Sequence, residues 1–103
     1  MANLGQKNIA QLITVVVGSP QTLEAAGFTI PYPVTLHITP GSTLNSTITV
    51  KQRGSATGEF HNIPLPTATP GIFSAYDVVK LDGGVEALQF TAAVSDGIVE
   101  LAQ

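Results

Sequence analysis

The stretch from Val34 to Arg53, VTLHITPGSTLNSTITVKQR, identifies the chain as a β protein. Apolar and polar residues alternate on both sides of the segment PGSTLN, whose composition is typical of a turn. Successive side chains of a strand point to opposite faces. We therefore expect strands at Val34–Thr39 and Ser46–Arg53, each with an apolar face inside and a Thr-rich face outside.

Working outward, turn chemistry and alternating patterns predict further strands over most of the chain. The exception is Gln21–Gly27, QTLEAAG, which is suited to one or two helical turns ending at glycine. Pro64–Gly71 predicts a surface crossover, because proline cannot donate to a strand ladder. We expect the last three strands to form an antiparallel meander. The additional strands are expected at Ile9–Val17, Phe60–Ile63, Ile72–Leu81 (most clearly over Ala75–Leu81), Val85–Val94 and Gly97–Ala102, with hairpin signals at Asp82–Gly84 and Ser95–Gly97.

The number and spacing of these strands predict the fold class. About seven short strands with frequent turns are typical of an antiparallel, immunoglobulin-like β-sandwich, and a jelly roll is the alternative. The length of 103 residues fits a single domain over residues 1–103. The chain has no Cys and no Trp, so the likeness to immunoglobulin domains is one of architecture only, and no disulfide or thiolate site is available.

The charge content is the most informative feature of the composition. Only 11% of the residues are charged, with four Lys or Arg and seven Asp or Glu, whereas soluble domains usually carry about 25%. Because charges are depleted at the centres of protein interfaces, we expect a subunit of a larger assembly; a secreted β domain with a Thr- and Ser-rich surface is the alternative. The net charge of −3 argues against nucleic acid as a partner.

Membrane and secretion signals do not emerge from the pattern. No apolar run approaches the roughly 20 residues that a membrane-spanning helix requires. Residues 12–17 are too short, and too poorly flanked by basic residues, for the core of a signal peptide. We therefore expect no membrane partner and no signal peptide.

Residues that could carry out chemistry are few. The two histidines, His37 and His61, have no neighbours at metal-ligand spacing, and we expect no metal and no cofactor. No serine lies in a nucleophile elbow, and no glycine-rich loop carries the phosphate-binding lysine. Asn45 begins an Asn-Ser-Thr acceptor pattern, which also suits the end of a turn. We predict that the protein is not an enzyme and has no catalytic residues.

The segment QLITVVVGSP, residues 11–20, is apolar on both faces. A sandwich interior takes only one face of each strand, and an uncharged edge strand invites pairing with other chains. We assign Ile13, Val15 and Val17 to the sandwich and expect a homo-oligomer, with a trimer as one candidate, on a larger scaffold. Deleting residues 1–8 or placing Lys at Val15 is expected to release the protein from that scaffold without unfolding it. The interface is predicted at Leu4, Ile9, Leu12, Val15 and Val16, so Val15 belongs to both sets.

Part of the chain resembles a known group of proteins. The run STITVKQRGSATGEF, a Pro/Ala/Thr loop and VEALQFTAAVSDGIVELA are similar to the strand, loop and closing-hairpin pattern of small β-sandwich virion proteins of tailed bacteriophages. The resemblance spans roughly Thr35 to Ala102. It implies a decoration or cement protein on the capsid surface that binds the major capsid protein and stabilises the shell, with residues 1–8, MANLGQKN, as an arm. The alternatives are a tail, neck or fibre-base protein, and a secreted adhesin or carbohydrate-binding module.

Overall fold

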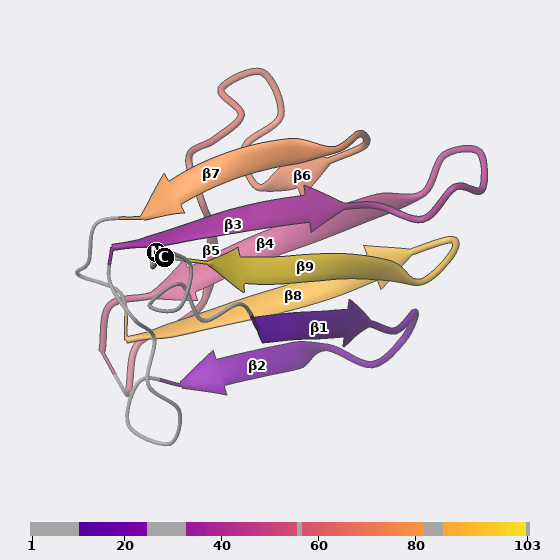
Figure 1. Cartoon of the computed structure of the whole chain (residues 1–103). Coiled ribbons are helices and arrows are strands. Elements are labelled where there is room, and N and C mark those ends of the chain that lie inside the picture. Colours follow the sequence, from indigo (N-terminus) through magenta and orange to yellow (C-terminus); the bar gives the residue numbers. More distant parts are fainter. Residues whose placement is uncertain (1–10, 25–32, 56, 82–85, 103) are drawn as a thin grey trace, which may run out of the picture.

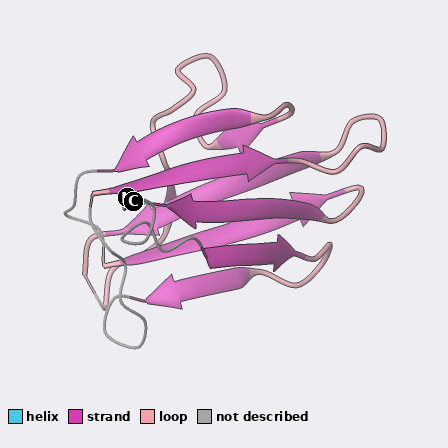
Figure 2. Ribbon diagram, in the orientation of Figure 1, coloured by secondary structure: helices cyan, strands magenta, loops and turns pink. Residues whose placement is uncertain are grey.

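The computed structural model describes residues 11–24, 33–55, 57–81 and 86–102. These residues form nine strands and no helix (Figures 1 and 2). Most of the strands coincide with stretches in which apolar and polar residues alternate, as the sequence predicts. The strands are β1 (Gln11–Val15), β2 (Gln21–Glu24), β3 (Val34–Thr39), β4 (Thr47–Arg53), β5 (His61–Asn62), β6 (Ile72–Phe73), β7 (Asp77–Leu81), β8 (Ala87–Ala93) and β9 (Gly97–Ala102).

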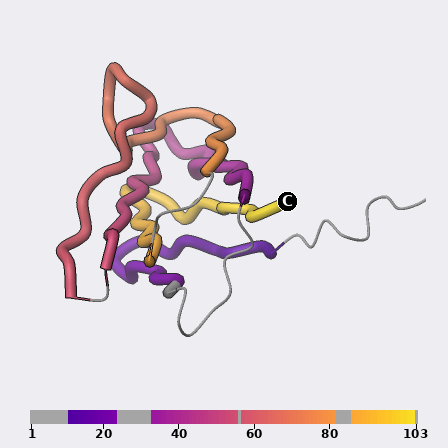
Figure 3. Tube along the Cα trace, turned by 90° about the vertical axis from the view of Figure 1, so that its left-hand side faces the viewer, coloured from indigo at the N-terminus to yellow at the C-terminus, as the bar shows by residue number. Residues whose placement is uncertain are grey.

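The strands form two antiparallel sheets that pack together as a β-sandwich. The first sheet has the order β1-β9-β3-β7, and the second has the order β2-β8-β4-β5, with β6 also paired to β4. Figure 3 shows β9, in yellow, running between β1 and β3. The predicted all-β sandwich is thereby confirmed.

The pairing is nested, since each early strand pairs with a late one. β1 pairs with β9, β2 with β8, β3 with β7, and β4 with β5 and β6. Such nesting arises when one long antiparallel ribbon is rolled up, which is the arrangement of a jelly roll. An immunoglobulin domain instead places its first two strands side by side in one sheet. The strand order therefore follows the alternative that the sequence left open.

Three local predictions are wrong. Gln21–Glu24 is a strand rather than a helical turn, because it pairs with β8 and places Leu23 opposite Leu88 at the core. The expected strand at Ile72–Leu81 is divided into β6 and β7, which belong to different sheets. The last three strands do not form a meander, because β8 lies in the second sheet while β7 and β9 both border β3. The hairpin signal at Asp82–Gly84 lies outside the described residues.

The core lies between the sheets and is built from the inward-facing residue of each alternating pair. Phe90 and Phe73 from the second sheet meet the aliphatic side chains of the first. Each large side chain that is removed from water contributes about 1.5–3 kcal/mol. The buried cluster comprises Ile13, Val15, Val34, Leu36, Ile38, Ile48, Val50, Ile63, Phe73, Val79, Leu88, Phe90, Val99 and Leu101.

Candidate interaction surface

Titratable side chains in the described part of the chain do not converge on a metal site. Residues 11–24, 33–55, 57–81 and 86–102 contain no group of three or more His, Asp or Glu that could hold an ion. His37 lies on β3 of the first sheet and His61 on β5 of the second. No helix of sufficient length and hydrophobicity to cross a bilayer occurs among these residues.

The predicted interface residues separate into two sets. Leu12 and Val16 are exposed, at 65% and 39%. Val15 is fully buried in the core, where it is paired with Gly97 of β9. Its assignment to the interface is therefore wrong, and so is the expectation that Lys at this position would leave the fold intact, because an ammonium group would be buried without a partner. Leu4 and Ile9 lie outside the described residues.

Val17 also differs from its prediction. The alternating pattern places it with Ile13 and Val15 inside the sandwich, yet it is exposed. β1 ends at Val15, and the chain turns at Val16–Ser19 so that alternation no longer decides which side chain faces the core. The turn includes Gly18 at a φ of 80°.

Exposed aliphatic side chains gather at one end of the sandwich. The β1–β2, β3–β4 and β8–β9 connections all lie there, on the right in Figure 1. Leu44 is 82% exposed and Val94 is 56% exposed. We call this surface the loop end and define it by its exposed aliphatic residues, Val16, Val17, Leu44 and Val94.

Hydrogen bonds join the three connections of the loop end. The backbone N–H of Val17 donates to Oδ1 of Asp96 at 3.0 Å, which links the first connection to the third. The hydroxyl oxygens of Ser46 and Ser95 lie 2.5 Å apart and link the second connection to the third. The chain at Gly41 passes so close to Ser95 that an added Cβ would lie 2.0 Å from its Oγ. The aliphatic side chains of the loop end therefore lie on a braced support, that is, on three connections that are joined to one another by hydrogen bonds.

The backbone at Val94 is strained. Its φ is 77°, in the left-handed region that β-branched residues avoid. Asn45, on the neighbouring connection, has a φ of 69°, which asparagine tolerates well. Strain of this kind costs of order 1–3 kcal/mol and is concentrated at functional sites. A valine that bears this cost while its side chain points to solvent is a functional signal that the sequence pattern does not reveal, because the pattern places Val94 at the end of a strand.

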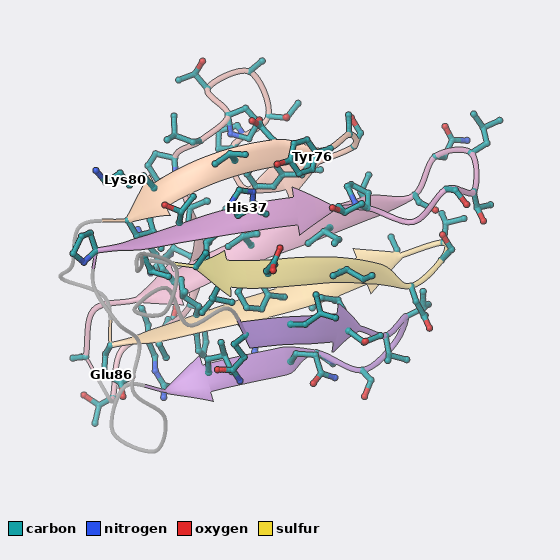
Figure 4. All side chains as sticks on the ribbon, in the orientation of Figure 1. His37, Tyr76, Lys80 and Glu86 are labelled. Atoms are coloured by element: carbon teal, nitrogen blue, oxygen red, sulfur yellow. The ribbon has the colours of Figure 1, made fainter. Side chains whose placement is uncertain are left out.

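The outer face of the first sheet carries a second set of exposed apolar side chains. Leu12 of β1, Ile98 of β9 and Val78 of β7 all project outward. Tyr76 precedes β7, and its hydroxyl lies 2.9 Å from Nδ1 of His37, with the two rings stacked (Figure 4). We call this surface the apolar face.

The outer face of the second sheet is chemically different. Thr49 pairs with Thr91, Thr47 with Ala93, and Gln89 donates from Nε2 to the Thr22 hydroxyl at 3.3 Å. Among the described residues of this sheet, the outward aliphatic side chain of note is Ile72, exposed at 40%. The two outer faces therefore differ in their exposed side chains, and the apolar face belongs to the sheet that contains β1.

One ion pair supports the opposite end of the second sheet. Nε of Arg53 donates to Oε1 of Glu86 at 2.7 Å, and the guanidinium lies 4.7 Å above the Phe60 ring. Both charged side chains are largely buried. The arrangement ties the end of β4 to the start of β8 and gives these charges a structural role.

Comparison of the chain with known protein families, curated proteins and solved structures finds no match.

Proposed function

We propose that this chain is a virion structural protein of the decoration or cement type, which binds an assembled capsid shell through its loop end. Support comes from the low charge of the chain, from its likeness to phage β-sandwich proteins and from its jelly-roll strand order. Jelly rolls are frequent among viral capsid proteins and lectins. The observation that carries the proposal is the strained, solvent-exposed Val94 on a braced connection.

The loop end has the chemistry of a protein-binding surface. Its aliphatic side chains gain free energy when water is displaced, and their support is already ordered, so little conformational entropy is lost on binding. The carboxylate of Asp96 at this end already accepts the Val17 N–H. A neutral, apolar hollow between neighbouring capsid subunits would match this surface.

Stabilisation of the shell follows from mass action. A protein that binds the assembled shell, but not dispersed subunits, shifts the equilibrium toward assembly. The loop end is defined by four exposed aliphatic residues, far fewer than the about 20–30 residues a side of a stable pairwise interface. Several linked copies on one particle would therefore raise the overall affinity through avidity.

The test uses particles assembled from the major capsid protein encoded with this chain. Leu44→Ser and Val94→Asn should each lower the amount of protein that co-sediments with particles by about tenfold, because each removes an aliphatic side chain whose burial contributes about 1.5–3 kcal/mol and about 1.4 kcal/mol is a tenfold change in affinity. Asparagine retains compatibility with the left-handed backbone at position 94. Leu65→Ser is the matched control, since Leu65 is also an exposed leucine but lies on the β5–β6 connection.

Binding of both loop-end variants at wild-type occupancy would exclude the loop end as the docking surface. Absence of the wild-type protein from particles would exclude the virion role. If electron microscopy of labelled particles found the protein at the tail or neck, the function would be that of the tail or fibre-base alternative. Binding of glycans by the isolated wild-type protein would favour the adhesin alternative.

A further inference from the structure

The apolar face contains a row of four residues that runs across the first sheet. The pairing register places Leu12 opposite Glu100, Glu100 opposite His37, and His37 opposite Val78. The row therefore begins and ends with an exposed aliphatic residue and has two polar residues at its centre. Read from either edge of the sheet, it has the same chemical pattern.

We propose that a second copy of this chain packs its apolar face against the same face of the first. The two copies are related by a two-fold axis that lies in the interface, parallel to the strands and midway between β9 and β3. Sheets that pack face to face lie about 10 Å apart, and a two-fold interface presents one patch to itself. A row with this symmetric pattern is self-complementary under such an axis. The proposal concerns association of the isolated protein and does not depend on the proposed role in virions.

The axis brings complementary groups together. β9 lies over β3 of the partner, so Glu100 lies opposite the partner's His37, and the same contact recurs on the other side of the axis. β1 lies over β7 of the partner, which places Leu12 opposite the partner's Val78. Ile98 lies opposite the partner's Thr39, because Ile98 and Thr39 are themselves neighbours in the register. Along the row of four residues, therefore, an apolar side chain meets an apolar one at each edge, and a hydrogen-bond acceptor meets a donor at the centre.

The Tyr76 contact prepares His37 for this role. The Tyr76 hydroxyl lies 2.9 Å from Nδ1. In the neutral tautomer in which this hydroxyl is the donor, the imidazole carries its own proton at Nε2 and can donate it to a carboxylate. The stacked tyrosine ring also restrains the orientation of the imidazole. Because Glu100 and His37 lie on the two central strands, they lie beside the axis, and their pairing would set the register of the dimer.

The size of the face limits the affinity. Four strands about 4.8 Å apart and about five residues long give a footprint of roughly 15 by 15 Å, which is below the standard interface of about 800 Å² per partner. We therefore expect a reversible dimer with a dissociation constant in the range of about 1–100 µM, rather than a permanent one.

The first test is analytical ultracentrifugation of the full chain over about 1–500 µM, a range chosen to bracket that constant. The wild type should shift from monomer to dimer. Ile98→Arg should weaken dimerisation by about tenfold or more, as expected when an apolar side chain of a central strand is replaced by a charge that the interface would bury. Ile72→Arg is the matched control, because Ile72 has the same 40% exposure on the outer face of the other sheet.

Charge exchange tests the register itself. Glu100→Arg and His37→Glu should each weaken the dimer, since each places like or unmatched groups across the axis, and the double variant should recover at least part of the affinity. Circular dichroism checks that each variant is folded. A wild-type chain that stays monomeric throughout the range would overturn the proposal. So would a trimer, equal effects of Ile98→Arg and Ile72→Arg, or a double variant that is weaker than both single variants.

Discussion

Ser46 and Ser95 are 49 positions apart in the sequence, yet their hydroxyl oxygens lie 2.5 Å apart where two connections of the loop end meet. Ser46 is almost fully buried, and it is the buried polar side chain of the described residues. Its hydrogen bond joins the start of β4 to the turn before β9, and therefore holds the two sheets together at this end.

Replacement of one member of this pair should destabilise the protein. Ser95→Ala leaves the Ser46 hydroxyl buried without its partner, which costs about 1–3 kcal/mol. The free energy of unfolding, measured by urea titration, should fall by that amount. The double variant with Ser46→Ala should recover part of the loss, because no buried hydroxyl then remains. Exposed Ser74→Ala serves as the control and should change stability by less than about 0.5 kcal/mol.

A lysine should affect the stability of the fold very differently at two adjacent positions of β1. Val15→Lys buries an ammonium group in the core and should lower the free energy of unfolding by more than about 4 kcal/mol. Thr14→Lys, on the exposed side of the same strand, should leave the protein folded. Thermal unfolding followed by circular dichroism distinguishes the two. A cooperative transition for Val15→Lys near the wild-type temperature would show that Val15 is not part of the core.

Relief of backbone strain at position 94 should not destabilise the fold. Val94→Gly removes strain of order 1–3 kcal/mol against a gain in unfolded-state entropy worth about 0.4–1 kcal/mol. We expect a net stabilisation of about 1 kcal/mol and a melting temperature several degrees higher. Val78→Gly in β7 is the control and should lower stability. A lower melting temperature for Val94→Gly would show that the backbone conformation at Val94 does not cost the protein stability.

Two glycines with the same backbone conformation should respond differently to alanine. Gly18 and Gly71 have φ values of 80° and 78°. A Cβ at Gly18 meets nothing within 4 Å, whereas one at Gly71 would lie 2.6 Å from Cβ of Asn62 and 2.9 Å from the carbonyl oxygen of Val50.

Gly18→Ala therefore bears only the cost of the left-handed conformation, about 1 kcal/mol. Gly71→Ala adds a clash with backbone that cannot move aside freely, so its loss should exceed that of Gly18→Ala by about 1–3 kcal/mol. Denaturant unfolding of both variants gives the comparison. Equal losses at the two positions would show that the close approach at Gly71 relaxes without cost.

Alternation allowed the strands around Val34–Thr39, Ser46–Arg53 and Gly97–Ala102 to be predicted closely, because the period of two is a property of each strand alone. It also correctly assigned Leu12 and Val16 to an exposed surface. It failed at Val17, where the chain leaves the strand, and at Gln21–Glu24, where pairing with β8 overrides a local preference for helix. The strain at Val94 follows from the path of the chain between the sheets, which no local pattern encodes.

The amino-acid sequence alone is enough to predict an all-β chain with one apolar core and few charges. It also predicts more apolar surface than one sandwich can enclose. Each of these follows from composition and from short-range alternation. The nested order of the strands depends on which distant segments meet, and hairpin signals between neighbours predicted a meander instead. Packing of two sheets around one core placed Val15 inside and Val94 outside, since a side chain's exposure depends on what lies across from it in space.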